Sequence, residues 1–301
     1  MINRISSIIL ILFLAGCAGG QAIKTPPHEQ AALDVHLRGT RQLQSGELEA
    51  ARMNLVAAYK LFAAVEHRVG SSATLINLAS LERRSGNYRE SALYLSQADS
   101  LAVTTHQGQI AYEQALLALA STDLASAERS AREVLNADPS LRGAAHNLIA
   151  RIHFISQDYE VARKHVDQAL NTLPDADLQE RANAYRLRGK IDQVQAIHDA
   201  GVSFLEKALK MDQQLKRADK IALDLKLLAD SHRALENWKK ELNYLRRLYL
   251  VEMNSGENEK GSATLELMAT RLEARGLEEQ ANELRTNAVT FNKLGVMPTL
   301  W

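Results

Sequence analysis

The stretch that decides the fold is 115–139, ALLALASTDLASAERSAREVLNADP, and its pattern returns at 150–174 as ARIHFISQDYEVARKHVDQALNTLP. In both stretches a small residue is followed by another twelve positions later, with a short polar turn between them. A Pro closes each stretch, and Pro ends helices because its ring disfavours helical backbone in the preceding residue. The two stretches therefore predict two copies of one helix–turn–helix unit, 35 residues apart.

The same frame of small residues runs through most of the chain. Each copy has a small residue, a second one twelve positions later and a third one seven positions after that. The seven copies are Gly39/Ala51/Ala58, Ala79/Ser91/Ala98, Ala115/Ala127/Val134, Ala150/Ala162/Ala169, Gly189/Gly201/Ala208, Ala229/Glu241/Leu248 and Ala269/Ala281/Ala288. Of these 21 positions, 18 are Gly, Ala or Ser. Antiparallel helices approach closely only where side chains are small, so the frame predicts seven helix pairs.

Turns and large apolar residues complete the repeat. The turns that separate the helices of the first four copies are Ser45-Gly46-Glu47-Leu48, Ser85-Gly86-Asn87-Tyr88, Ser121-Thr122-Asp123-Leu124 and Ser156-Gln157-Asp158-Tyr159. Between the small positions lie the predicted core residues Leu55, Leu78, Leu95, Ile149, Val166, Leu205, Leu228, Leu245 and Met268. Each of these turns ends on a Leu or Tyr, an apolar residue that can fix the angle between the two helices.

This set of features resembles the tetratricopeptide repeat family over about residues 30–292. The resemblance implies an all-α fold, a right-handed superhelical solenoid of about seven antiparallel helix pairs. Its concave wall would be built from the first helix of each pair, and such proteins bind peptides or proteins. Spacings near 40 residues exceed the 34 of the family, so several pairs should have longer helices.

The start of the chain is typical of a secretory signal. Arg4 precedes an apolar run of roughly twelve residues, which as a helix spans only about 18 Å of a membrane core about 30 Å thick. Leu14-Ala15-Gly16-Cys17 then resembles the bacterial lipobox, and Cys17 is the single Cys of the chain. The resemblance implies that Cys17 accepts a diacylglycerol, while an ordinary signal peptide with an incidental Cys is the alternative.

These features divide the chain into four parts. We expect a signal peptide at 1–16, a lipidated flexible tether at 17–29, the repeat solenoid at 30–294 and a C-terminal tail at 295–301. Ala18 follows the lipobox where an Asp would resemble an inner-membrane retention signal. The expected location is therefore the bacterial outer membrane, with the solenoid on the periplasmic side.

The charge balance and the motifs exclude several classes of function. The 36 Lys and Arg residues equal the 36 Asp and Glu residues, which disfavours binding to nucleic acid. Nucleophile, zinc-protease and phosphate-loop motifs are absent from the sequence, so we expect no enzyme, no cofactor and no metal. His146 and His153 are seven residues apart and would suit a metal pair, but the repeat frame favours packing histidines, as for His232.

The expected binding surface follows from fixed offsets from the first small residue of each copy. Across copies two to six these wall positions hold seven basic residues and one acidic residue, with apolar side chains among them. The predicted groove consists of Arg83, Arg84, Tyr112, Asn147, Arg151, Phe154, Ile155, Arg186, Lys190, Lys226 and Arg233. This composition favours an acidic or amphipathic peptide.

Together these observations favour a scaffold or adaptor lipoprotein in an envelope assembly. Its pathway would be outer-membrane protein insertion, pilus or secretion assembly, or docking of cell-wall hydrolases. The alternative is a cell-wall or polysaccharide-binding lipoprotein serving export, for which Tyr112, Phe154, Asn147 and Asn183 would supply stacking rings and carboxamides. A catalytic activity without a recognisable motif is the third and weakest hypothesis.

Overall fold

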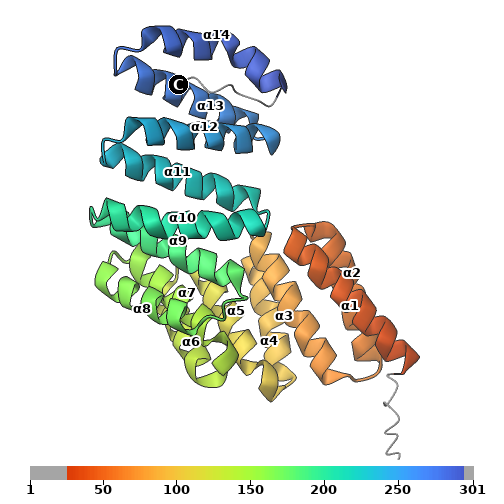
Figure 1. Ribbon diagram of the computed structural model, residues 1–301. Helices are drawn as coiled ribbons and strands as arrows, with labels where there is room; N and C mark the ends of the chain where they lie inside the picture. The colour runs from red at the N-terminus through yellow and green to blue at the C-terminus, as the bar shows by residue number, and fades with distance from the viewer. Residues whose placement is uncertain (1–25, 295–301) are drawn as a thin grey trace, which may run out of the picture.

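The computed structural model describes residues 26–294, apart from the side chains of 287 and 289–294. Across this range the chain forms fourteen α-helices in seven antiparallel pairs, with no strand (Figure 1). The first helices of the pairs are α1 (Pro27–Ser45), α3 (Arg68–Arg84), α5 (Gln107–Ala120), α7 (Arg142–Ile155), α9 (Leu178–Val194), α11 (Ala218–Ala234) and α13 (Asn258–Glu273). The second helices are α2 (Leu48–Ala64), α4 (Tyr88–Ser100), α6 (Leu124–Ala137), α8 (Tyr159–Thr172), α10 (His198–Gln214), α12 (Trp238–Asn254) and α14 (Glu278–Leu294). Short 3₁₀ helices, η1 (Thr104–His106) and η2 (Pro139–Leu141), precede α5 and α7.

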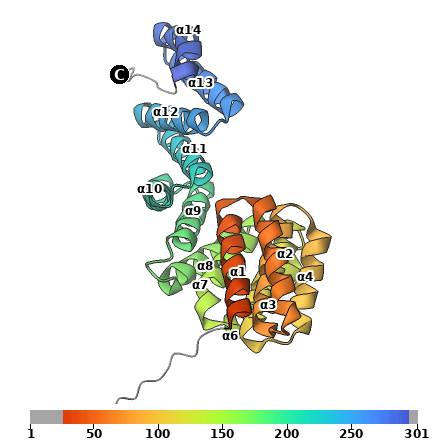
Figure 2. The same cartoon turned by 90° about the vertical axis from the view of Figure 1, so that its right-hand side faces the viewer.

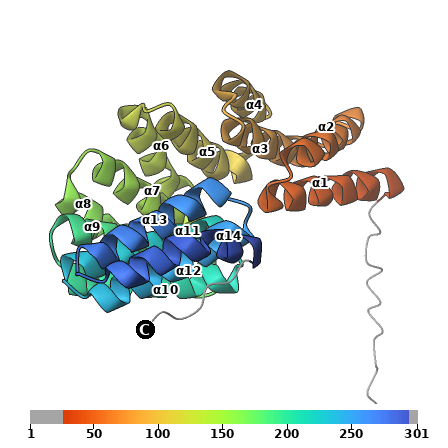
Figure 3. The same ribbon diagram turned by 90° about the horizontal axis from the view of Figure 1, so that it is seen from above.

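The seven pairs stack into the right-handed superhelical solenoid that the sequence predicts. Successive first helices touch one another from α1 to α11, so they form the inner, concave wall. Seen from above, the chain curves from α1 through α7 and continues round to α14 (Figure 3). In Figure 2 the helices from α9 to α14 rise as a column from the group formed by α1–α8.

The predicted turns are present and share one backbone feature. Each contains a residue in the left-handed region: Gly46 (φ 86°), Gly86 (φ 83°), Thr122 (φ 63°) and Gln157 (φ 63°). Glycine adopts this conformation without strain, whereas Thr and Gln rarely do. Where glycine is missing, the following Asp caps the next helix; the carboxylate of Asp123 accepts a hydrogen bond from the backbone N–H of Ser126 at 3.0 Å.

The frame of small residues is confirmed as the packing surface between helices. Twenty of its 21 positions are buried, and Ala288 is partly buried. Gly189 shows the reason, because a Cβ built there would lie only 3.1 Å from the carbonyl oxygen of Gly201 on the partner helix. In the second copy the hydroxyl of Ser91 donates to the carbonyl of Ala79 at 2.8 Å. The nine predicted core residues are also all buried.

Glu241, which breaks the frame in the sixth copy, is buried as the centre of an ion-pair cluster. Its carboxylate pairs with Arg271 at 3.0 Å and with Arg275 at 3.3 Å, both from the next pair of helices. The interface that small residues form elsewhere is therefore held by charge at this position. Leu248, the second exception in this copy, packs in the apolar core.

The solenoid has a region of shorter helices and regions of longer helices, as the spacing between copies of the repeat predicts. Helices α5–α8 have 14 residues each, as short tetratricopeptide repeats require. Helices α9–α12 have 17 residues each, like α2 and α3. At a rise of about 1.5 Å per residue, three more residues lengthen a helix by about 4.5 Å.

The predicted boundary between tether and solenoid is wrong, and two predicted features near the ends of the chain lie outside the described residues. Helix α1 begins at Pro27, so 27–29 belong to the solenoid and not to a flexible tether. Proline suits this position because its fixed φ matches the helix and its missing N–H needs no partner there. Cys17 and the tail at 295–301 lie outside the described residues. Within 26–294, no helix has both the length and the apolar character needed to cross a membrane.

Candidate binding cleft

A cleft of about 560 Å³ opens in the concave wall, and we call it the mixed cleft. Its lining residues come from the first helices α3, α5, α7, α9 and α11. Eight of the eleven predicted groove residues line it: Arg83, Tyr112, Asn147, Arg151, Phe154, Ile155, Arg186 and Lys190. The offsets in the sequence therefore predicted most of the lining of the mixed cleft. They did not predict which of its charged side chains are paired with acids.

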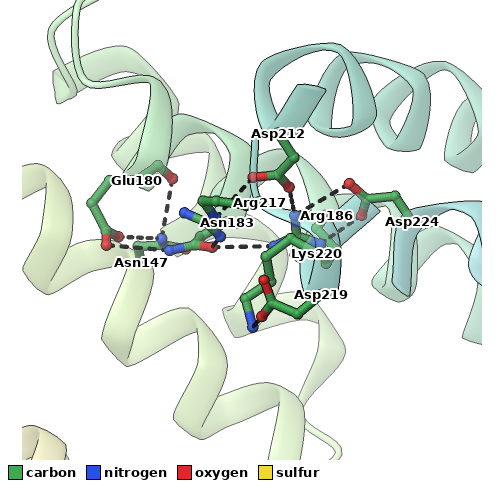
Figure 4. A network of polar contacts seen from close by, with 9 residues as sticks. All are labelled: Asn147, Glu180, Asn183, Arg186, Asp212, Arg217, Asp219, Lys220 and Asp224. Carbon is green, nitrogen blue, oxygen red and sulfur yellow. Dashed lines mark hydrogen bonds and ion pairs between the residues drawn. The ribbon is translucent and has the colours of Figure 1, made fainter. Parts of the chain in front are cut away.

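Arg186 is part of the buried floor of the mixed cleft. Its guanidinium donates to the two carboxylate oxygens of Asp224, from Nε at 2.5 Å and from Nη2 at 3.2 Å, and also to Asp212 (Figure 4). Arg186 is only 6% exposed, and both acids are buried. Arg217 pairs with the other oxygen of Asp212 at 3.1 Å. The charge of Arg186 is thus neutralised inside the protein, which its wall position did not predict.

Burial shifts the pKa of two carboxyl groups at the mixed cleft, those of Asp224 and Glu180. It raises the pKa of Asp224 to about 7; the nearby Arg186 opposes this rise and Asp212 adds to it. Burial likewise raises the pKa of Glu180. A carboxylate that loses its hydration shell is disfavoured in its charged form unless hydrogen bonds and cations compensate fully. The charge on Asp224 and Glu180 therefore depends on burial, which favours the neutral acid, and on the hydrogen bonds and cations, which favour the carboxylate.

The two asparagines proposed as ligand-binding carboxamides are engaged within the wall (Figure 4). The amide of Asn147 donates to the carboxylate of Glu180 at 2.8 Å, and Asn183 donates to the same group at 3.2 Å. The side-chain amide oxygen of Asn183 accepts a hydrogen bond from Arg186 at 3.1 Å. Glu180 itself was not predicted, because it occupies none of the wall offsets.

Two further cations of the lining have acidic partners. Arg83 pairs with Glu113 at 3.1 Å, and both are part of the first-helix wall. Lys220, which was not predicted, pairs with Asp219 at 3.0 Å. Of the seven basic residues counted along the wall, Arg83 and Arg186 are therefore paired with acids at positions that the count did not include.

Arg151 and Lys190 are different, because neither forms an ion pair with any residue in the described range. Arg151 is exposed, and Lys190 is partly buried with its ammonium 4.7 Å from the ring centroid of Phe154. Burial lowers the pKa of Lys190, and the positive charges of Arg151 and Arg186 lower it further. The mixed cleft thus contains two like charges without a counter-ion.

Apolar and hydroxyl groups complete the lining. Phe154, Ile155, Leu116 and Leu223 contribute apolar surface, and Ile155 is 48% exposed. Tyr112 lies among them, and burial followed by the charge of Glu180 raises the pKa of its hydroxyl. The hydroxyl therefore stays protonated and can donate a hydrogen bond; none links it to another described residue.

The other three predicted groove residues lie outside the mixed cleft. Arg84 is exposed and donates to the backbone carbonyl of Leu43 in the preceding pair. Lys226 and Arg233 are exposed on α11, where Arg233 pairs with Asp230 at 3.6 Å. These exposed cations provide natural controls for Arg151 and Lys190.

The histidines pack between helices, as the repeat frame favours. His146 and His153 are partly buried, and His232 is buried and stacked on Tyr244 at 5.4 Å. His165, which was not predicted, forms a hydrogen bond with His146 through their Nδ1 atoms at 3.0 Å. Among the described residues, no group of three or more His, Cys, Asp or Glu is arranged to bind a metal.

A second hollow, of about 520 Å³, lies among the ends of α10, α11 and α12. Its lining is mainly apolar, with Ile221, Leu250 and Val251, and Lys216 is its one charged side chain. It is more open than the mixed cleft and includes none of the predicted groove residues. The mixed cleft is therefore the stronger candidate site.

Comparison with known proteins supports the fold through structure alone. No protein-family model matches the sequence, and no curated protein matches it. The apo form of RapI is similar at a TM-score of 0.68 and 9% identity, over 87% of this chain and 77% of that one. A STAND protein with a tetratricopeptide repeat sensor, from Pyrococcus horikoshii, is similar at 0.67 and 13% identity, over 88% and 43%. A Rap protein complexed with competence and sporulation factor is similar at 0.57 and 12% identity, over 89% and 77%.

These similarities agree with the repeat frame, the turns and the stacking of helix pairs. The chain has the tetratricopeptide repeat fold.

Proposed function

We propose that the protein is a scaffold or adaptor whose mixed cleft binds a peptide segment of a partner protein. The observation that supports this most is the presence of Arg151 and Lys190, two cations without counter-ions, beside the apolar side chains of Phe154 and Ile155. Unpaired charge next to exposed apolar surface in a concavity suits a ligand that brings both an anion and an apolar group.

The fold supports the same proposal. Stacked helix pairs present a continuous concave wall, and the mixed cleft spans five first helices of it. The Rap protein with a similar fold was solved in complex with competence and sporulation factor. That complex shows a molecular partner bound to one protein of this architecture.

The contacts give less support to polysaccharide binding, the alternative from the sequence. Sugar rings stack on open aromatic faces, but Lys190 lies over the ring of Phe154, and Tyr159 packs against that ring at 5.7 Å. Sugars also need free carboxamides, whereas Asn147 and Asn183 already bond to Glu180. The geometry therefore favours a peptide.

Crosslinking in cells followed by affinity capture tests the proposal. Replacing Arg151 and Lys190 with Glu reverses their charges and should abolish capture of the partner that the wild-type chain captures. Reversing Lys226 and Arg233 to Glu changes the net charge equally outside the mixed cleft and should leave capture unchanged. Equal capture by both double variants would place the partner elsewhere. The captured partner also distinguishes among membrane-protein insertion, pilus or secretion assembly and hydrolase docking.

We also propose that Cys17 is lipidated and anchors the chain to the outer membrane, on its periplasmic side. The lipobox-like sequence Leu14–Cys17 and the following Ala18 support this. Labelled palmitate should enter the wild-type protein, and Cys17→Ala should abolish labelling and release the chain from membranes. Ala18→Asp should keep the label and shift the protein to the inner-membrane fraction. Labelling that survives Cys17→Ala would refute the anchor. The absence of enzymatic activity stays a prediction.

A further inference from the structure

The mixed cleft has much less positive charge than its sequence suggests. Arg83, Arg186 and Lys220 are each paired with acids, which leaves Arg151 and Lys190 as the unpaired cations. Glu180 is the one acid of the lining, and it is held by asparagine amides without an ion pair. Two unpaired cations and one partly buried acid leave the lining with a net excess of a single positive charge.

A strongly acidic segment therefore fits the mixed cleft poorly. Its first carboxylate would meet Arg151 and Lys190, but the next would approach Glu180 or the buried Asp224 beneath Arg186. Like charges brought together in a partly desolvated cleft repel strongly, and this repulsion rejects unsuitable partners. The arrangement selects for one anionic group.

Lys190 occupies the place where such a group would bind. In the free protein its ammonium faces the ring of Phe154, and Arg151 is close enough for its charge to act on Lys190. The ring offers only a weak, partial substitute for a counter-ion. A carboxylate between the two cations would give Lys190 a stronger partner and free one face of Phe154 for an apolar side chain.

We infer that the ligand of the mixed cleft presents a single carboxylate next to an apolar side chain, and that Lys190 leaves the Phe154 ring to bind that carboxylate. The apolar side chain then packs on Phe154, Ile155 and Leu223, which line the same cleft. Tyr112 can donate its hydroxyl hydrogen to a backbone carbonyl of the ligand. This inference rests on the proposed peptide binding and specifies its chemistry: one acid, or one free C-terminus, beside a Leu-like residue.

Selection from a pooled library of random-sequence peptides, made with free and with amidated C-termini, tests the inference. The wild-type chain is compared with Arg151→Gln/Lys190→Gln and with the control Lys226→Gln/Arg233→Gln. Wild type and control should retain peptides with one acidic group adjacent to Leu, Ile, Val or Phe. The Arg151→Gln/Lys190→Gln variant should lose this enrichment by about tenfold, the loss expected from removing a charge-assisted contact.

The outcomes separate the two proposals. If no peptide is retained above background, the proposed function fails. If the retained peptides carry runs of acids, carry basic residues, or bind the Gln double variant equally, peptide binding can stand but the single-carboxylate inference is refuted. Enrichment only among peptides with a free C-terminus would identify the bound group as the terminal carboxylate. Enrichment among free and amidated peptides alike would identify it as an acidic side chain. Either result supports the inference.

A minimal probe tests the movement of Lys190 directly. N-acetyl-L-leucine has one carboxylate next to an apolar side chain, and N-acetyl-L-leucinamide is its uncharged counterpart. In NMR titrations the acid should shift the Lys190 ammonium and Phe154 ring signals and raise the pKa of Lys190, because a counter-ion stabilises the charged form. The amide should shift neither signal. Equal shifts with both compounds, or no shift with the acid, would contradict the movement of Lys190 from the Phe154 ring to the carboxylate.

Discussion

Helices α5–α8 and α9–α12 are neighbouring parts of one solenoid that are packed by different means. In α5–α8 each helix has 14 residues, and Asn147 is the one buried polar side chain among the described residues there. In α9–α12 each helix has 17 residues, and the buried polar side chains are Arg186, Asp192, Asp212, Asp224, Ser231, His232 and Glu241. The mixed cleft lies where these two regions meet.

The difference shows how one repeat frame accommodates two kinds of interior. The shorter helices meet through alanines such as Ala127 and Ala162, where the contact depends on shape. The longer helices add buried acids, each held by an Arg from a neighbouring helix. Buried ion pairs add little net stability when intact but are costly when one partner is removed. The two regions should therefore respond differently to substitution and to pH.

The largest effect is expected from Arg186→Met, which leaves Asp212 and Asp224 buried without their shared cation. The free energy of unfolding should fall by about 3–5 kcal/mol, measured by denaturant titration. Adding Asp224→Asn to this variant should restore part of the loss. Arg151→Met is the matched control, and as an exposed substitution it should change stability by no more than about 0.5 kcal/mol. Similar losses in both variants would contradict the role given to the buried network.

A smaller effect is expected in the region packed by small residues. Ala162 is fully buried against the partner helix, so Ala162→Leu should cost about 1–3 kcal/mol through overpacking. Lys164→Leu adds a similar side chain at an exposed position of the same helix and serves as control. An unchanged melting temperature for Ala162→Leu would mean that the frame is misplaced in this repeat.

The smallest effect is a difference in the pH dependence of stability. Burial raises the pKa of Asp224 from 3.8 to about 7, so in this range the folded protein holds a proton there that the unfolded chain releases. The stability from this group is present at low pH and is lost as the pH rises through about 7. Asp224→Asn should therefore lose less stability than the wild type between pH 5 and pH 8, in denaturant titrations at each pH.

Asp230→Asn, on the exposed face of the same helix, is the control for this measurement. It should show the wild-type dependence on pH. A parallel dependence for Asp224→Asn and the wild type would mean that Asp224 does not titrate in this range.

Sequence alone determined the architecture of this protein, because each repeat depends on local turns and on nearest neighbours. Ala115, Ala127 and their counterparts recur at intervals that only stacked helix pairs explain, and the turns lie between them. The same offsets located the concave wall and most of the mixed cleft. Glu241 could not be assigned in this way, since its partners Arg271 and Arg275 belong to another repeat.

Only the tertiary structure decided which wall residues are free to bind. Arg151 and Arg186 look alike in the sequence as basic residues at wall positions, yet the first is exposed and the second is buried between two acids. Those acids are 26 and 38 residues away along the chain. Charge pairing depends on distance in space and on the loss of water around each group, and neither is set by local sequence.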